Sequence, residues 1–95
     1  MKTVEIKSGG KTAAGLEFPL GNAVLVAARA EKGYVMCGYL SIETAEKLWD
    51  AAGVVRGVKT IEELLDGKVS GMTSKAKILG VETGMTGREA LEKMA

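Results

Sequence analysis

The sequence predicts an α+β fold, a two-layer α/β sandwich in which an antiparallel N-terminal strand meander leads into a mixed sheet with helices packed mainly on one face. Two observations support this prediction. Apolar residues in the first forty positions recur with the two-residue period of strands, and the later positions carry helix-capping signals. Because strands come first and helices follow, the helices are expected to cover one side of a shared sheet.

Length and composition predict a single α/β domain over residues 1–95, because the chain is too short for two. Thirteen basic and twelve acidic side chains give a net charge of +1, without the clustered Lys and Arg of a nucleic-acid surface. No stretch approaches the ~20 apolar residues of a membrane helix, so neither nucleic acid nor membrane is predicted as a partner. One cysteine and no apolar signal core predict a reduced, cytoplasmic protein.

The first two predicted strands form a hairpin. Residues 3–7 alternate in polarity, the glycine pair within residues 8–11 signals a tight turn, and the return strand runs from about 12 to 18. Pro19 cannot donate a ladder hydrogen bond, so it is expected to end this strand or to lie at an edge. Gly21 and Asn22 are then expected to turn the chain.

Two further strands complete the predicted meander. Residues 23–28 are apolar on both faces, which is typical of a strand in the middle of a covered sheet. The segment Glu31-Lys32-Gly33 signals a second hairpin turn, and the fourth strand is expected from Tyr34 to about Tyr39.

The main helix is predicted directly after this strand. Ser41 can cap it, Gly53 can end it in a left-handed conformation, and one apolar face is shared by Ile42, Ala45, Leu48, Trp49 and Ala52.

Shorter elements are expected to fill the remaining chain. A strand is predicted at 54–58, a weak strand at 68–72 and a helical turn at 74–79. Two capping boxes, Thr60 with Glu63 and Thr86 with Glu89, predict a short helix that ends at Asp66-Gly67 and a last helix.

Three blocks of the sequence carry a family resemblance: Lys32 to Gly38, Gly57 to Leu65, and Leu79 to Val81 followed by Gly84 to Leu91. In order and spacing they resemble the YunC-like family of small bacterial and archaeal proteins of unknown function. The resemblance implies a two-layer α/β fold and no established activity.

The inventory of reactive side chains is small. The absence of histidine excludes Ser-His and Cys-His nucleophile pairs, and one cysteine is too few for a zinc site, so no metal and no cofactor are predicted. Cys37 has two interpretations, a buried hydrophobe in a central strand or a catalytic thiolate activated by a nearby cation. Lys59, Lys75 and Arg88 are the cations considered for that role.

Three predicted helix starts combine a hydroxyl cap with a nearby cation: Lys59-Thr60, Ser74-Lys75 and Thr86-Gly87-Arg88. A helix start can hold an anion because free N–H groups and the helix dipole act together, although plain capping explains the same residues. The anion-binding candidates are Lys59, Thr60, Lys75, Thr86, Gly87 and Arg88.

The strand pattern also predicts self-association. Residues 23–28 and 34–40 are apolar on both faces, so helices on one side would leave a second apolar face uncovered. A homodimer is predicted to bury that face, unless the last helix crosses to it. The predicted function is therefore a self-associating binding or structural module. The alternative is an enzyme acting on a small anionic molecule that bears a phosphate or carboxylate.

Overall fold

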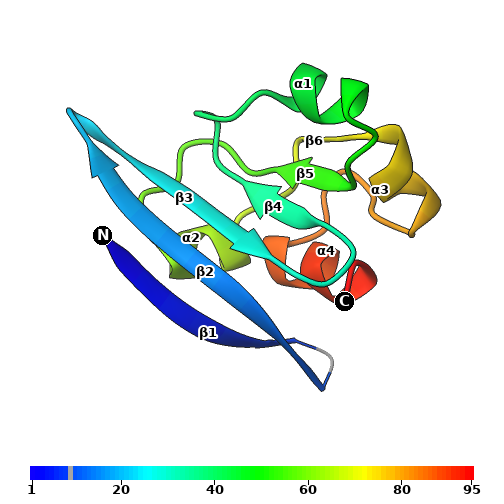
Figure 1. Cartoon of the computed structure of the whole chain (residues 1–95), viewed down its shortest axis with the longest axis horizontal. Coiled ribbons are helices and arrows are strands. Elements are labelled where there is room, and N and C mark those ends of the chain that lie inside the picture. Colours follow the sequence, from blue (N-terminus) through cyan, green and yellow to red (C-terminus); the bar gives the residue numbers. More distant parts are fainter. Residues whose placement is uncertain (9) are drawn as a thin grey trace.

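The structure, a computed structural model, describes residues 1–8 and 10–95. Its strands form one six-stranded sheet in the order β1-β2-β3-β4-β5-β6 (Figure 1). Their bounds are β1 Lys2–Ser8, β2 Lys11–Leu20, β3 Ala23–Arg29, β4 Tyr34–Met36, β5 Ala52–Val54 and β6 Gly71–Met72. The helices are α1 Ile42–Lys47, α2 Ile61–Asp66, α3 Ser74–Ile78 and α4 Gly87–Lys93. Within the described residues, none of these helices is long and apolar enough to cross a membrane.

The sheet is mixed, as predicted. Strands β1 to β4 form an antiparallel meander, β4 and β5 pair in parallel, and β5 and β6 pair antiparallel. A parallel pair needs a crossover connection, and α1 provides it. The strand order and pairing confirm the predicted α+β class.

The hairpin turns agree with the glycine signals where they are described. Leu20 pairs with Ala23 across a two-residue loop in which Gly21 has a φ of 51°. The predicted first turn includes Gly9, which lies outside the described residues. Pro19 does not end β2 but lies inside it. The pairing with β1 stops two residues earlier, where Glu17 pairs with Lys2, the first residue of β1. The missing N–H is tolerated there because β1 no longer pairs with that edge.

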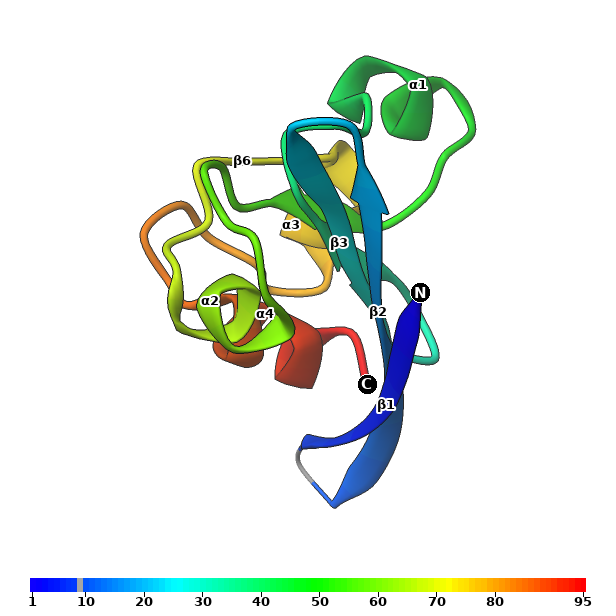
Figure 2. The ribbon, with the colours of Figure 1, turned by 90° about the vertical axis from the view of Figure 1, so that its left-hand side faces the viewer.

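The helices lie on both faces of the sheet, unequally (Figure 2). Helices α2 and α4 pack on one face, and Ala76 of α3 joins the same hydrophobic core. Helix α1 lies on the opposite face, where Ala45 packs with Met36 and Val54. The face that carries α1 is called the second face below. Most of these helices thus lie on one face, as predicted. The helix on the opposite face is α1, not the last helix of the chain.

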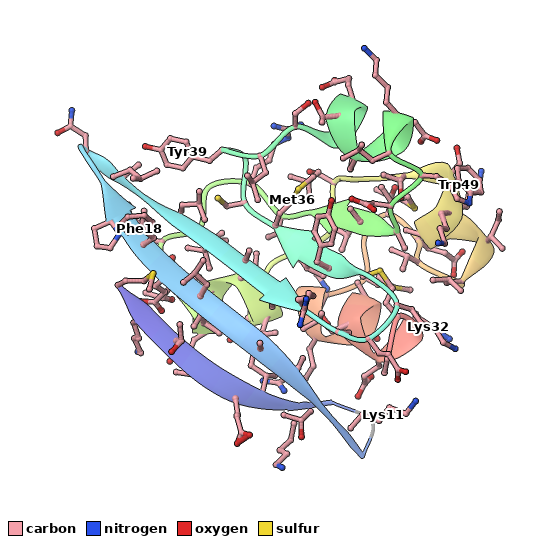
Figure 3. All side chains as sticks on the ribbon, in the orientation of Figure 1. Lys11, Phe18, Lys32, Met36, Tyr39 and Trp49 are labelled. Carbon is pink, nitrogen blue, oxygen red and sulfur yellow. The ribbon has the colours of Figure 1, made fainter. Side chains whose placement is uncertain are left out.

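Several predicted boundaries are wrong, among them the strand expected at 54–58, which runs instead from Ala52 to Val54 as β5. Strand β4 ends at Met36, so Tyr39 and Leu40 lie in an exposed turn instead of a strand (Figure 3). Helix α1 ends at Lys47, because residues 52–54 pair with β4 as strand β5. Trp49, with a φ of 58°, takes the left-handed position that the sequence suggested for Gly53.

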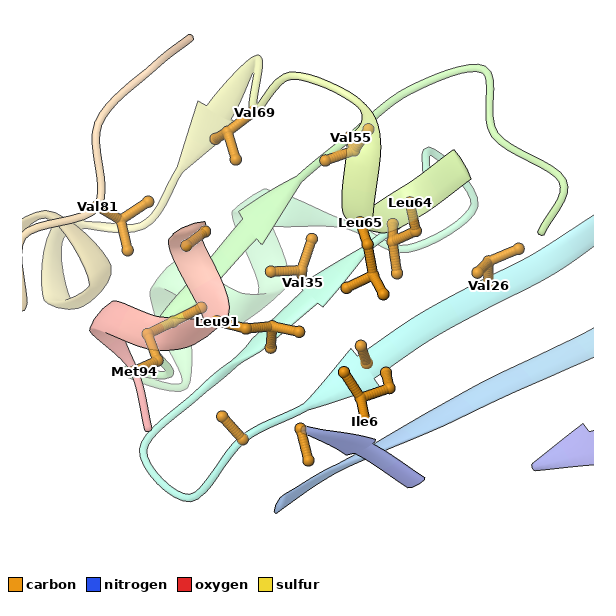
Figure 4. Close-up of a cluster of buried hydrophobic side chains, with 14 of the residues drawn as sticks. Ile6, Val26, Val35, Val55, Leu64, Leu65, Val69, Val81, Leu91 and Met94 are labelled. Atoms are coloured by element: carbon orange, nitrogen blue, oxygen red, sulfur yellow. The ribbon is translucent and has the colours of Figure 1, made fainter. Parts of the chain in front are cut away.

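The main core lies between the sheet and the α2–α4 layer (Figure 4). Val26 and Val35 contribute from the central strands, Leu64 from α2, and Leu91 and Met94 from the α4 end of the chain, all fully buried. Burying one such side chain stabilises the fold by about 1.5–3 kcal/mol. This core fixes β3, β4 and α2, and the start of β3, the turn after β4 and the loop before α2 line a mainly apolar crevice.

Candidate functional site

A crevice of about 350 Å³ opens where the parallel strands β4 and β5 end. The turn after β4 forms one wall and the β5–α2 loop forms the other. The lining residues are Ala23, Val24, Cys37, Gly38, Tyr39, Gly57, Val58 and Lys59. The Tyr39 hydroxyl donates to the Leu20 carbonyl oxygen at 3.4 Å and so holds this wall against the tip of the β2–β3 hairpin.

Cys37 forms part of the crevice lining but is only 3% exposed. Its Sγ accepts a hydrogen bond from the Val26 N–H at 3.3 Å and lies 4.0 Å from the Val24 carbonyl oxygen. These contacts satisfy a buried thiol without any charged partner. A catalytic role for Cys37 stays a prediction.

One of the three predicted cations shares a crevice with Cys37. Lys59 lines the same crevice, whereas Lys75 and Arg88 do not. Sequence reasoning missed Arg56, whose Nη1 lies 3.7 Å from the place a Cβ would take on Gly38. The signal for Arg56 was weak, because a single arginine after a strand has no distinctive spacing.

The start of α2 is occupied by carboxylates of the chain itself. The Thr60 hydroxyl accepts from the Glu63 N–H at 3.1 Å, and Glu63 in turn accepts from the Lys59 N–H at 2.7 Å. Glu17 of β2 accepts from the Ile61 N–H at 2.8 Å. The helix begins where it was predicted, but Glu63 reaches one residue further back than in a standard capping box.

The start of α3 differs from the prediction. Thr73, not Ser74, is the N-cap, and its hydroxyl accepts from the Ala76 N–H. Glu46 of α1 accepts from the Ser74 N–H at 2.9 Å and from the Ser74 hydroxyl at 3.1 Å. The first free N–H of this helix therefore already has an anionic partner.

Lys75 faces a different cleft of about 230 Å³, which Arg29, Tyr34 and Asp50 also line. The Tyr34 hydroxyl donates to Asp50 Oδ2 at 2.9 Å. Burial, together with this hydrogen bond and the negative charge of Asp50, raises the pKa of Tyr34 to about 12. The tyrosine therefore stays a neutral donor throughout the physiological pH range.

The start of α4 is a complete capping box, as predicted. The Thr86 N–H donates to Glu89 Oε1 at 2.8 Å, and the Glu89 N–H donates to the Thr86 hydroxyl at 3.1 Å. The bonds from the Thr86 backbone and hydroxyl lower the pKa of Glu89. The Gly87 N–H donates to the Gly67 carbonyl oxygen at 3.0 Å, and Arg88 is exposed. The three helix starts do not share one cavity, and their anion-binding roles stay predictions.

Part of the second face is apolar and only partly covered: Phe18 is exposed, whereas Leu16, Leu25 and Ala27 are half-buried, and Leu25 also packs against the main core. Two cross-strand pairs, Leu16 with Ala27 and Phe18 with Leu25, lie beside the area that α1 covers. Phe18 is 44% exposed, whereas Met36 beneath α1 is 1% exposed (Figure 3). These four residues, Leu16, Phe18, Leu25 and Ala27, are called the second-face strip below.

Comparison with known proteins places the chain among proteins without an assigned activity. The sequence profile described as "Domain of unknown function (DUF1805)" matches residues 36–94. The chain belongs to the DUF1805 family. The matched part of this DUF1805 protein includes the crevice residues of the β4 turn and the β5–α2 loop, whereas β1, β2 and β3 lie outside it.

Two relatives extend the similarity over most of the DUF1805 protein. It is 39% identical over 87 residues to the uncharacterized protein YunC of Bacillus subtilis, covering 87% of this chain and 84% of that one. The crystal structure of TA1206, a protein of unknown function from Thermoplasma acidophilum, matches with a TM-score of 0.93 and 37% identity. That match covers 99% of this chain and 92% of the other. The predicted YunC-like membership and fold are confirmed.

Proposed function

We propose that the protein is a self-associating binding module in which the second-face strips of two copies pack against each other. The observation that carries this proposal is the exposure of Phe18, at 44%, on a sheet face whose neighbouring positions are apolar. Contiguous apolar surface on a small protein usually marks an association site. Packing two such faces removes it from water.

The charges around the strip favour a second copy as the occupant. Glu5 and Arg29 both pair with Ala14 across the sheet, so these opposite charges project from the same face, and both are exposed. Neither takes part in the ion pair found among the described residues, which joins Lys11 and Glu31. A face that carries both signs beside an apolar strip is self-complementary under two-fold symmetry.

Light scattering coupled to size-exclusion chromatography tests the proposal at micromolar concentrations. The wild type is expected at twice the 9.9 kDa chain mass. Phe18→Lys is expected to give a folded monomer, because a charge would be buried in the interface without a partner. Ile78→Lys is the matched control, since Ile78 is 73% exposed on α3, away from the strip, and should leave the dimer intact. A wild type that stays monomeric refutes the proposal.

The second function, an enzyme acting on a small anionic molecule, stays a prediction, and so does the cytoplasmic location. The free, buried Cys37 supports a reducing compartment.

A further inference from the structure

We propose that the crevice at the ends of β4 and β5 binds a small organic monocarboxylate with an apolar body, whose carboxylate meets Lys59. The connections of the two parallel strands provide the first argument. Strand β4 leads into α1 on one face, whereas the adjacent β5 leads into α2 on the other. Where neighbouring parallel strands send their connections to opposite faces, a ligand crevice forms at their carboxyl ends.

The size and lining of the crevice define the body of the ligand. Its volume of about 350 Å³ falls within the roughly 300–1,000 Å³ typical of small-molecule pockets. Val24 and Val58 supply aliphatic walls, and Tyr39 supplies an aromatic ring. Gly38 and Gly57 leave the backbone open to close approach by a ligand. A hydrated inorganic ion would leave these apolar walls unused, so the ligand needs a hydrocarbon part.

The lining also determines the charged group of the ligand. Apart from the Cys37 thiol and the Tyr39 phenol, it contains one ionisable side chain. That side chain is Lys59, which is exposed and has no ion-pair partner among the described residues. The nearby carboxylates of Glu17 and Glu63 do not line the crevice, and they already accept the Ile61 and Lys59 N–H groups. A ligand carboxylate would give the Lys59 ammonium its missing partner.

Backbone donors in both walls add to this site. Within the described part of the chain, the N–H groups of Gly38, Tyr39, Gly57 and Val58 donate no hydrogen bond to a protein acceptor. Backbone N–H groups without a protein acceptor are a common means of orienting an anionic ligand group. The Arg56 guanidinium, close to Gly38, adds positive potential at the mouth of the crevice.

Titration of the ¹⁵N-labelled protein with phenylacetate, followed by amide NMR, tests the proposal. Saturable shifts are expected at Gly38, Tyr39, Gly57 and Val58. Lys59→Gln should weaken binding about tenfold, which corresponds to about 1.4 kcal/mol, because the ligand carboxylate loses its charged partner. The neutral analogue phenylacetamide should also bind about tenfold more weakly, whereas Lys47→Gln, a surface control on α1, should bind like the wild type.

Gly38→Leu places a bulky side chain in one wall of the crevice and is expected to weaken phenylacetate binding, and thermal unfolding of the variant checks that it is folded. Absence of saturable shifts at the four amides overturns the proposal. So does equal binding of phenylacetamide, and so does inorganic phosphate binding as tightly as phenylacetate. Light scattering on the same samples reports the oligomeric state separately, so failure here is distinguishable from failure of self-association.

Discussion

Thr73 shows how much one buried residue can hold together. It is 1% exposed, and its hydroxyl donates to the Asp50 carbonyl oxygen at 2.6 Å. The Thr73 hydroxyl oxygen also accepts from the Ala52 N–H at 3.0 Å and from the Ala76 N–H at 3.3 Å. Thr73 thus joins strand β5 to the cap of α3. The sequence suggested Ser74 as the cap because two adjacent hydroxyls carry the same signal, and only packing against β5 selects Thr73.

Replacing Thr73 with valine is expected to destabilise the fold by at least about 2 kcal/mol, because it keeps the shape but leaves buried donors and an acceptor unpaired. Thr73→Ser keeps the hydroxyl and removes one methyl, which should cost about 1 kcal/mol. Urea denaturation monitored by circular dichroism measures both changes. A valine variant as stable as the serine variant would show that the hydrogen bonds contribute little.

At the scale of elements, α1 is the clearest difference between pattern and structure. Its apolar positions and Gly53 predicted a longer helix, yet residues 52–54 are fully buried in β5. The helix closes with the Asp50 N–H bonded to the Ala45 carbonyl oxygen, as in a Schellman motif. Pairing with β4 outweighs the local glycine signal. Burial on both faces of the sheet stabilises Ala52–Val54 more than one further helical turn would.

The contact between α2 and α4 leads to a prediction at the same scale. A Cβ on Gly87 would overlap the Leu64 carbonyl oxygen, which is rigid backbone. Gly87→Ala should therefore destabilise the protein by about 1–3 kcal/mol or more, because the helices must move apart. Gly38→Ala is the matched control, since its Cβ would make only ordinary contacts. Thermal unfolding of both variants decides, and equal melting temperatures would contradict the close packing.

At the scale of the whole molecule, the sheet divides the helices three to one among the described elements. Of these helices, α1 alone lies on the second face and is too short to cover all of it, so the second-face strip remains beside the helix. The same division separates the connections after β4 and β5 and opens the crevice. The surface proposed for self-association and the crevice proposed for a ligand thus follow from one topological feature.

Self-association also predicts how stability depends on concentration. Unfolding of a dimer releases two chains, so the wild-type melting temperature should rise by a few degrees for each tenfold increase in protein concentration. Phe18→Lys should lose this dependence, and Ile78→Lys should retain it. Differential scanning fluorimetry over a hundredfold concentration range measures the trend. A wild-type melting temperature that does not change with concentration would argue against the dimer.

The sequence by itself determined the α+β class, the four-strand meander, and the caps at Ser41, Thr60 and Thr86, because these depend on periodicity and on contacts within a few residues. It also singled out Cys37 and Lys59, but not that both line one crevice. Only the tertiary structure decided the early end of α1, its place on the second face and the partners of each helix start. Those outcomes depend on contacts between residues far apart in the chain, such as Glu17 with Ile61, and no local pattern records them.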